Sequence, residues 1–444
     1  MDTFYKKFFL LMLPMALKEL ISSLVNLIDT VMVGQLGEAP IAAVGIGNQL
    51  YFLFNVFLFG ICCGASVFSS QFWGKQDIPK MRNVLGISLI LSVSLGFLFT
   101  FSALVFPNEI YMAYNANEET LKIGVEYLRI VSIGYIATAI TTAFDFSVCS
   151  SEKASLPFIV RIVGLVINVI MNTVLIFGFF GIPAMGVKGA AIATVIARVS
   201  ELIIMLSVVY GKKYIQAAKL SELFTIPKSL FGKFWKVSTP VILNEMAWAL
   251  GMTAYSWVYA RISLDGMVII TIVQNIERLM LVFFHGGGNA AGILIGKAVG
   301  SGDTEAAYTY GKKLALLSGS TAIVVSIAFV FCRPLFMLPY KVSPEIYSQT
   351  MNMLLILAVM MNFKSMSFLL IVGVFRNGGD TKISALIDVF TVWLVGVPAV
   401  MLSGFFFHLP LIACYAIMSL EEIAKVSFSI IHFRSKKWIK SVVG

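Results

Sequence analysis

Asp29 is the residue of this chain whose type and position most clearly indicate chemistry. It lies near the end of an apolar stretch, residues 8–33, and about 20 apolar residues suffice to cross a bilayer. Ser22, Asn26 and Asp29 are spaced four and then three residues apart, so on a helix they form one polar stripe. A carboxylate in a membrane helix costs about 2.5–3.5 kcal/mol on insertion scales and normally faces a protein interior or a wet cavity. The stripe indicates a proton or cation site. The alternative is a structural hydrogen bond, which a neutral residue would satisfy at lower cost.

A second set of polar residues, Glu245, Glu277, Lys364 and Asp380, also falls in or beside apolar stretches. Glu277 and Lys364 lie near the centres of theirs, and Arg278 follows Glu277 directly. Because unpaired charges at this depth are disfavoured, the choice is between a buried ion network and a proton-labile centre. The Gly-Gly-Asp-Thr sequence around Asp380 also reads as a turn and helix N-cap, which gives that acid a structural alternative.

Composition places these residues in a membrane protein. Of the 444 residues, 59% are hydrophobic and only 13% are charged, which is more apolar surface than an aqueous fold can hide. Twelve apolar runs are long enough to span a bilayer. They are 8–33, 40–72, 84–106, 121–148, 158–180, 187–210, 235–262, 265–299, 308–331, 347–375, 382–404 and 408–433. We therefore predict an all-α integral membrane protein with twelve transmembrane helices.

The distribution of basic residues predicts the orientation of these helices. An even number of spans places both termini on the same side, and Lys and Arg are enriched in cytoplasmic segments. If the termini are cytoplasmic, 22 of the 33 Lys and Arg residues fall on inner segments and 6 on outer ones. We expect a multi-pass protein with both termini in the cytoplasm. The formal charge of +10 is thus explained by topology, and nucleic acid is not an expected partner.

The chain also contains an internal repeat at an offset of about 226 residues. Leu13-Pro14 recurs as Thr239-Pro240, and the Gly-x-x-Asp turn at residues 74–77 recurs at 300–303. The longest polar link separates the two copies, so we predict an N-terminal lobe at 1–210, a cytoplasmic linker at 211–236 and a C-terminal lobe at 237–444. Each lobe has six spans, which makes the repeat parallel and places a substrate path between the halves.

Four motifs in this order resemble the multidrug and toxic compound extrusion (MATE) family. They are the repeated Gly-x-x-Asp turn, Asp29–Gly34, Gly186–Thr194 and Arg376–Thr381. The resemblance covers all twelve spans. It implies two six-helix lobes related by a pseudo-twofold axis, alternating access, and export of bulky, often cationic compounds in exchange for H+ or Na+, with no other cofactor.

The resemblance also implies a cation site in the N-terminal lobe. Family members with such a site use a first-helix Asp, which matches Asp29, and an Asn and an Asp four apart in the fifth helix. Here those positions are Asn168 and Asn172. Thr194 matches a further oxygen ligand, and Asn26 lies on the same stripe as Asp29. Because the second acid is missing, the site should hold Na+ weakly, and protonation of Asp29 is the simpler option. No other metal is expected.

The C-terminal lobe departs further from the family pattern. Some members carry a Glu eight residues after the seventh-helix Pro, where this chain has Trp248. Glu245 lies three residues earlier, about one turn deeper on nearly the same face. The resemblance matches Asp380 to a tenth-helix acid used in cation coupling. Glu245, Glu277, Lys364 and Asp380 are therefore secondary candidates.

The leading hypothesis is a cation-coupled antiporter of the plasma membrane that exports organic cations, drugs or other amphiphilic compounds. The alternative is a flippase for a lipid-linked saccharide or related lipid, but acids outnumber bases inside the spans, which favours a cationic cargo. No HExxH or GxxxxGK[ST] motif is present, so we expect neither an enzyme nor an ATP-driven pump. The expected partners are the small-molecule cargo and membrane lipid, and we expect a monomer.

Overall fold

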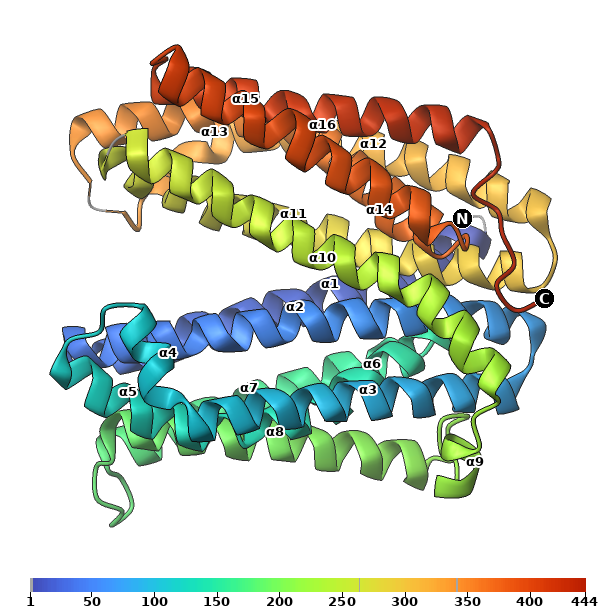
Figure 1. The fold of residues 1–444 in the computed structure, drawn as a ribbon, viewed down its shortest axis with the longest axis horizontal. Coiled ribbons are helices and arrows are strands. Elements are labelled where there is room, and N and C mark those ends of the chain that lie inside the picture. The colour runs from blue at the N-terminus through green and yellow to red at the C-terminus, as the bar shows by residue number, and fades with distance from the viewer. Residues whose placement is uncertain (1–2, 263, 341) are drawn as a thin grey trace. The chain divides into compact units, whose positions relative to one another are not determined.

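A computed structural model describes residues 3–262, 264–340 and 342–444, and these residues are almost entirely helical (Figure 1). The uninterrupted long helices are α1 (Thr3–Gly34), α2 (Glu38–Lys75), α3 (Ile78–Val105), α7 (Ser155–Phe177), α8 (Gly186–Gly211), α10 (Lys228–Ile262), α11 (Leu264–Gly300), α12 (Thr304–Met337) and α16 (Leu411–Arg434). Two short helices, α4 (Pro107–Ala113) and α9 (Leu220–Phe224), lie in connections.

Three further spans are interrupted. α5 (Glu118–Val131) and α6 (Gly134–Ser150) form one path with a bend of 45°. α13 (Pro344–Phe368) continues as the π-helix η1 (Leu369–Arg376). The next span consists of α14 (Thr381–Phe390), η2 (Thr391–Gly396), α15 (Val397–Met401) and η3 (Leu402–Phe406). Such π-helical turns are rare and frequently occur at functional sites.

Among the described residues, seven of the uninterrupted helices and the two spans with π-helices are long and apolar enough to cross a membrane. The α5–α6 pair makes a tenth such element. α10 and α16 are also long, but they carry internal charges such as Glu245 and Lys425. With these two, the described chain contains twelve long helical elements at the positions expected from hydropathy. The prediction of a twelve-helix, all-α membrane protein is confirmed.

The repeated Gly-x-x-Asp motif forms the same helix start in both halves. Asp77 is the N-cap of α3 and Asp303 is the N-cap of α12. Each carboxylate accepts a hydrogen bond from the backbone N–H three residues later, at 3.2 and 2.8 Å. The residue before each cap has a left-handed backbone, with φ of 59° at Gln76 and 82° at Gly302. The motif therefore encodes a tight turn followed by a capped helix.

The ends of α2 and α11 cross at a backbone contact that obeys the repeat. A Cβ on Gly74 would lie 2.0 Å from the Lys297 carbonyl oxygen, and one on Gly300 would lie 1.9 Å from the Gln71 carbonyl oxygen. Gly74 and Gly300 are 226 residues apart, and so are Gln71 and Lys297. The two contacts are thus equivalent in the repeat, and only glycine permits this approach at either position.

The chain packs as two compact units. The N unit contains Leu17–Ser69 and Gln76–Phe234, and the C unit contains Met1–Ala16, Ser70–Lys75 and Trp235–Gly444. The start of α1, up to Ala16, and the end of α2, from Ser70, therefore pack with the C unit. The lobe limits at 210 and 236 follow from the longest polar link in the sequence, and they stay a prediction.

The core of the N unit lies between α3, α6, α7 and α8, which pack in the pairs α7–α8, α3–α6 and α6–α8. Aromatic side chains of α2 and α6 meet in this core. Phe54 stacks on Tyr135 with ring centroids 5.1 Å apart, and Tyr51 lies 5.5 Å from the same ring. This aromatic packing joins α2 to α6.

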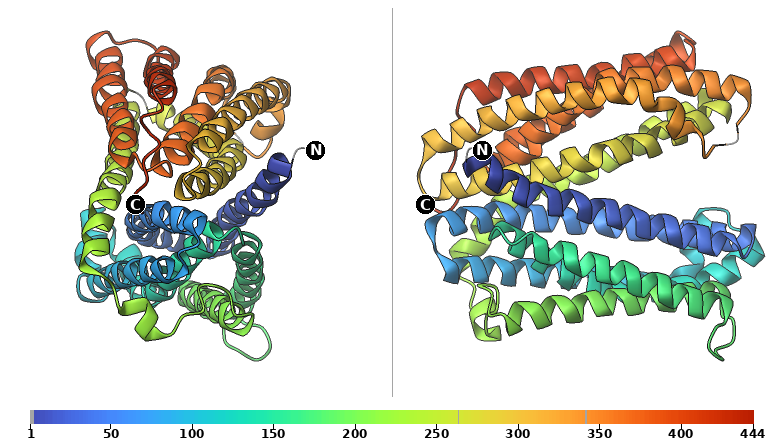
Figure 2. Two further views of the ribbon diagram at one scale, coloured as in Figure 1. Left: turned by 90° about the vertical axis from the view of Figure 1, so that its right-hand side faces the viewer. Right: turned by 180° about the vertical axis from the view of Figure 1, so that it is seen from behind.

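In the C unit, α11 packs against α12, α13 and η1, and α13 packs against both α12 and α16 (Figure 2). The chain after α16 folds back onto the unit. Trp438 is fully buried, Gly379 and Ile439 form an isolated antiparallel bridge, and the Gln71 amide donates to the Lys440 carbonyl at 3.2 Å. This C-terminal tail therefore covers the end of η1 and the end of α2.

Candidate cation site

Three helices of the N unit bring the predicted cation-site residues together. Asn26 and Asp29 lie on α1, Asn168 and Asn172 on α7, and Thr194 on α8. The Asn172 amide nitrogen donates to Asp29 Oδ1 at 2.5 Å and to Asn168 Oδ1 at 3.3 Å. Asn168 and Asn172 are buried, 1% and 0% exposed. Asn172 thus links the acid of α1 to α7.

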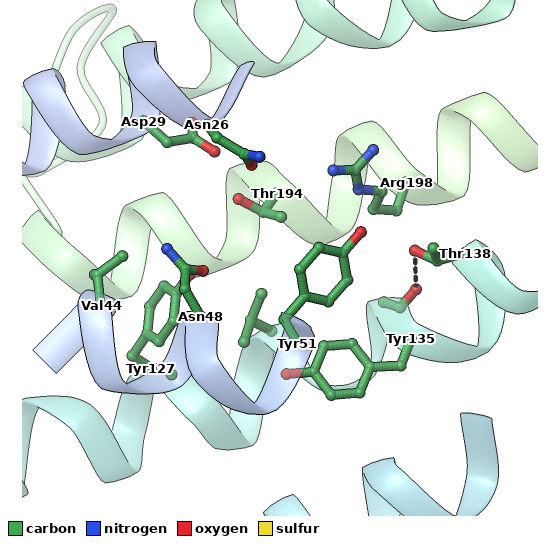
Figure 3. Close-up of a pocket in the computed structure, with 13 residues that line it drawn as sticks. Asn26, Asp29, Val44, Asn48, Tyr51, Tyr127, Tyr135, Thr138, Thr194 and Arg198 are labelled. Atoms are coloured by element: carbon green, nitrogen blue, oxygen red, sulfur yellow. Dashed lines mark hydrogen bonds between the residues drawn. The ribbon is translucent and has the colours of Figure 1, made fainter. Parts of the chain in front are cut away.

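The same acid opens onto a small cavity, which Figure 3 shows lined by side chains from α1, α2, α5, α6 and α8. Asn26 and Asp29 face Thr194 and Arg198 across it. About 40 Å³ is accessible to water, which is enough for a water molecule or a small cation. A drug-sized ligand needs roughly 300 Å³ or more. The cavity is therefore of the size of an ion and not of a drug.

The oxygen atoms around the cavity suit a cation. Asp29 supplies a carboxylate, and Asn26, Asn48 and Thr194 supply further oxygens. The Thr194 hydroxyl donates to the Ala190 carbonyl at 3.0 Å, so its lone pairs stay available. Within the described chain, Oδ1 of Asn172 is buried and has no hydrogen-bond partner. Buried polar atoms normally have one, and a rotation of this amide would direct its oxygen to a cation beside Asp29.

Sequence reasoning did not assign several residues to this cavity, namely Asn48, Tyr51, Tyr127, Tyr135 and Arg198. The position of Arg198 could have been read from its spacing, because it follows Thr194 by four residues and shares its helix face. The tyrosines carry no such signal. They reach the cavity through the packing of α2, α5 and α6.

Arg198 begins a buried chain of ion pairs that leads away from the cavity. Its guanidinium donates to Glu201 at 3.1 Å, and Arg161 donates to the same carboxylate at 3.0 Å. Arg161 also lies 3.8 Å from Asp145. A Cβ on Gly164 would lie 2.2 Å from the Glu201 carboxylate, so glycine makes room for this acid. The chain holds Arg198 in place and puts a positive charge at the wall of the cavity.

The secondary candidates form separate contacts in the described part of the C unit. Lys364 pairs with Glu277 at 2.5 Å, and both side chains are largely buried. Glu245 pairs with Arg376 at 2.7 Å. Arg278 is exposed. The contacts are thus two separate pairs and not one network, which was one of the two alternatives, and Arg376 was not among the expected partners.

Asp380 contacts the C-terminal tail and not the buried pairs. It occupies the N-cap position of α14, but its side chain makes no capping bond within the described chain. Its carboxylate contacts His432 at 3.2 Å and Lys440 at 2.8 Å. Burial opposes ionisation, but the hydrogen bonds and charges of His432 and Lys440 outweigh it and lower the pKa of Asp380 below its ordinary value.

Comparison with known proteins identifies the same family for both halves of the chain. Residues 14–174 and 240–402 both match one family model, MatE. The two stretches begin 226 residues apart, which is the offset of the internal repeat. The chain is 25% identical over 417 residues to the uncharacterized transporter YisQ of Bacillus subtilis, covering 93% of this chain and 90% of the relative. It is 23% identical over 446 residues to the probable multidrug resistance protein NorM of Thermotoga maritima, covering 99% and 94%.

Solved structures share the fold. An outward-facing multidrug resistance MATE family transporter of the MOP superfamily superposes with a TM-score of 0.87 at 19% identity, over 97% of this chain and 96% of that chain. A MOP superfamily transporter from Pyrococcus furiosus Vc1 superposes with a TM-score of 0.86 at 20% identity, over 97% and 95%. The fold therefore extends over nearly the whole chain.

Proposed function

Because this chain belongs to the MatE family, we propose that it is a cation-coupled antiporter that exports organic cations or other amphiphilic compounds by alternating access. It acts in the cell membrane with both termini in the cytoplasm, as the distribution of Lys and Arg favours. Each chain contains both halves of the repeat, so a monomer is the working unit. Curated relatives with names of multidrug resistance proteins support the cargo class.

The observation that carries this proposal is the contact between Asp29 and Asn172 beside an ion-sized cavity. A hydrogen bond to an ionised carboxylate is worth about 1.5–3 kcal/mol, and one to a neutral group about 0.5–1.5 kcal/mol. Protonation of Asp29 therefore weakens the link between α1 and α7 by about 1–2 kcal/mol. Since each 1.4 kcal/mol is a factor of ten, this change is large enough to shift the packing of α1.

The contacts favour H+ over Na+ as the coupling ion. A proton on Asp29 needs no additional ligand and leaves the hydrogen bond from Asn172 in place, although weaker. Na+ would require the Asn172 amide to turn its oxygen toward Asp29, with Asn168 and Thr194 completing the coordination. The site has one carboxylate where sodium-binding relatives implied by the family resemblance have two.

Efflux of a fluorescent organic cation from whole cells tests the proposal. Asp29→Asn keeps the size of the side chain and removes the acid, so export should be abolished at unchanged expression. The matched control is Glu109→Gln, an exposed acid of the same unit, which should export at the wild-type rate. Wild-type export by Asp29→Asn would exclude Asp29 as the coupling acid.

A further inference from the structure

The C unit contains a buried charge cluster that the Asp29 site does not use. The ammonium of Lys425 lies 2.8 Å from Glu421, 3.0 Å from Asp388 and 3.6 Å from Glu422. The three acids and the lysine are 6–14% exposed at their side chains. Asp388 belongs to α14 and the others to α16. We refer to these four residues as the Lys425 cluster.

Each carboxylate of the cluster also accepts a hydrogen bond from another helix. The Asn244 amide of α10 donates to Asp388 at 3.0 Å. The Ser367 hydroxyl of α13 donates to Glu422 at 2.9 Å, and the Tyr255 hydroxyl of α10 donates to Glu421. The acids are therefore held in place by neutral donors, and the ammonium of Lys425 lies within 3.6 Å of all three.

The charges of the cluster do not balance. Three ionised carboxylates and one ammonium leave two negative charges in excess. The cations on neighbouring elements already have acidic partners of their own, since Lys364 of α13 is paired with Glu277 of α11 and Arg376 of η1 with Glu245 of α10. An uncompensated buried ion is strongly disfavoured, and such a group takes up a proton instead. Acids in this close contact titrate together as one group.

Two buried tyrosines lie on α10 and α16, the helices that also carry Tyr255 and the two glutamates of the cluster. The hydroxyls of Tyr259 on α10 and Tyr415 on α16 have no hydrogen-bond partner in the described chain, and the residues are 1% and 4% exposed. A buried hydroxyl normally has a partner, and a bound water molecule would supply one in this polar region.

We propose that the Lys425 cluster is a second proton site, in which Glu421 and Glu422 share protons beside the ion pair of Lys425 and Asp388. It is separate from Asp29 and contains none of the C-unit residues that the family resemblance indicates. Proton binding at the cluster does not depend on the proposed antiport. Its use in transport does, and in that case the cluster carries protons in addition to the one at Asp29.

Infrared difference spectroscopy between neutral and alkaline pH tests proton binding directly, because a protonated carboxyl has its own C=O stretching band. On purified, reconstituted protein, Glu422→Gln should lose part of the band. The double variant Glu421→Gln with Glu422→Gln should lose all of the band that comes from the cluster, since the charges of Asp388 and Lys425 then cancel. Glu345→Gln, an exposed acid of the same unit, should leave the band unchanged. An unchanged band in the single and the double variant would overturn the proposal.

Two variants separate the cluster from the Asp29 site. Lys425→Met should enlarge the carboxyl band, because the acids lose their cation; an unchanged band would contradict the shared site. Asp29→Asn should abolish coupled export and retain the cluster's band. If Asp29→Asn exports normally while the Glu422→Gln band change is seen, the antiport assignment of Asp29 fails and the second proton site stands.

Discussion

Replacing Asn172 by Asp tests how the Asp29 cavity recognises a cation. The Asn172 amide contacts Asp29 at 2.5 Å, so Asn172→Asp places two carboxylates in contact. Position 172 is fully buried, and the new acid cannot turn to solvent. The substitution also supplies the second carboxylate that the family resemblance associates with cation binding at this position. Asn172→Leu is the matched control, because it removes the same hydrogen bond without adding an acid.

The size of the effect follows from the separation of the two acids. Two unit charges about 4 Å apart interact by about 4 kcal/mol at an effective dielectric constant of about 20. At a pH high enough to ionise both acids, this repulsion destabilises the cation-free site of the variant. A cation bound between the acids relieves it, so Na+ affinity should rise by up to about a thousandfold over the wild-type protein, since each 1.4 kcal/mol is tenfold.

Thermal unfolding of the purified protein measures this change. A ligand that binds only the folded state at about 100 times its Kd stabilises it by about 2.7 kcal/mol. Asn172→Asp should therefore melt at a higher temperature in NaCl than in choline chloride of equal ionic strength. The wild type and Asn172→Leu should differ little between the two salts. An equal response to Na+ in Asn172→Asp and Asn172→Leu would refute the close contact of Asp29 with position 172.

Three further predictions concern the C unit. Trp438→Ala removes a fully buried side chain and should destabilise the fold by about 3–5 kcal/mol; a melting temperature equal to that of the exposed control Lys437→Ala would contradict the packing of the tail. Asp380 has a lowered pKa, so its stabilisation is present above the ordinary pKa of an Asp and is lost as the pH falls through the lowered value. Asp380→Asn should accordingly show a smaller loss of stability on acidification than the wild type, and parallel acid-unfolding curves would contradict this sign. Lys364→Met leaves Glu277 buried without its cation and should cost about 3–5 kcal/mol; the double variant with Glu277→Gln should recover part of it, and no recovery would argue against the pair.

The helices and their order could be predicted because the signals are local. Apolar runs of spanning length mark each helix, and the Gly-x-x-Asp repeat marks equivalent helix starts at Asp77 and Asp303. The interruptions were not predictable. The π-helices η1, η2 and η3 depend on a shift in backbone hydrogen bonding, which tertiary packing decides and residue type does not.

In the candidate site, too, local relations could be predicted and tertiary contacts could not. Asn168 and Asn172 share a helix face by their spacing, and the structure joins them to Asp29. The partners of the C-unit acids are far away in the sequence. Glu245 meets Arg376, and Asp380 meets Lys440 of the tail. Such pairs depend on which helices lie side by side, which a single sequence does not reveal.

The Lys425 cluster contains both a local relation and a tertiary contact. Glu421, Glu422 and Lys425 are related by helical spacing and could have been grouped from sequence. Asp388 joins them from another helix, and the excess of acids becomes apparent only when all four are together. A count of acids and bases along the chain cannot show which charges remain without a partner.

The most direct test of the central claim is uptake of a fluorescent organic cation into liposomes that contain the purified protein, with pH and sodium gradients imposed separately. We predict that a pH gradient alone, acidic on the side opposite the cargo, drives uptake by the wild type and not by Asp29→Asn. A wild-type rate that is the same with and without either gradient, or a gradient-driven rate that Asp29→Asn retains in full, would contradict cation-coupled export through Asp29.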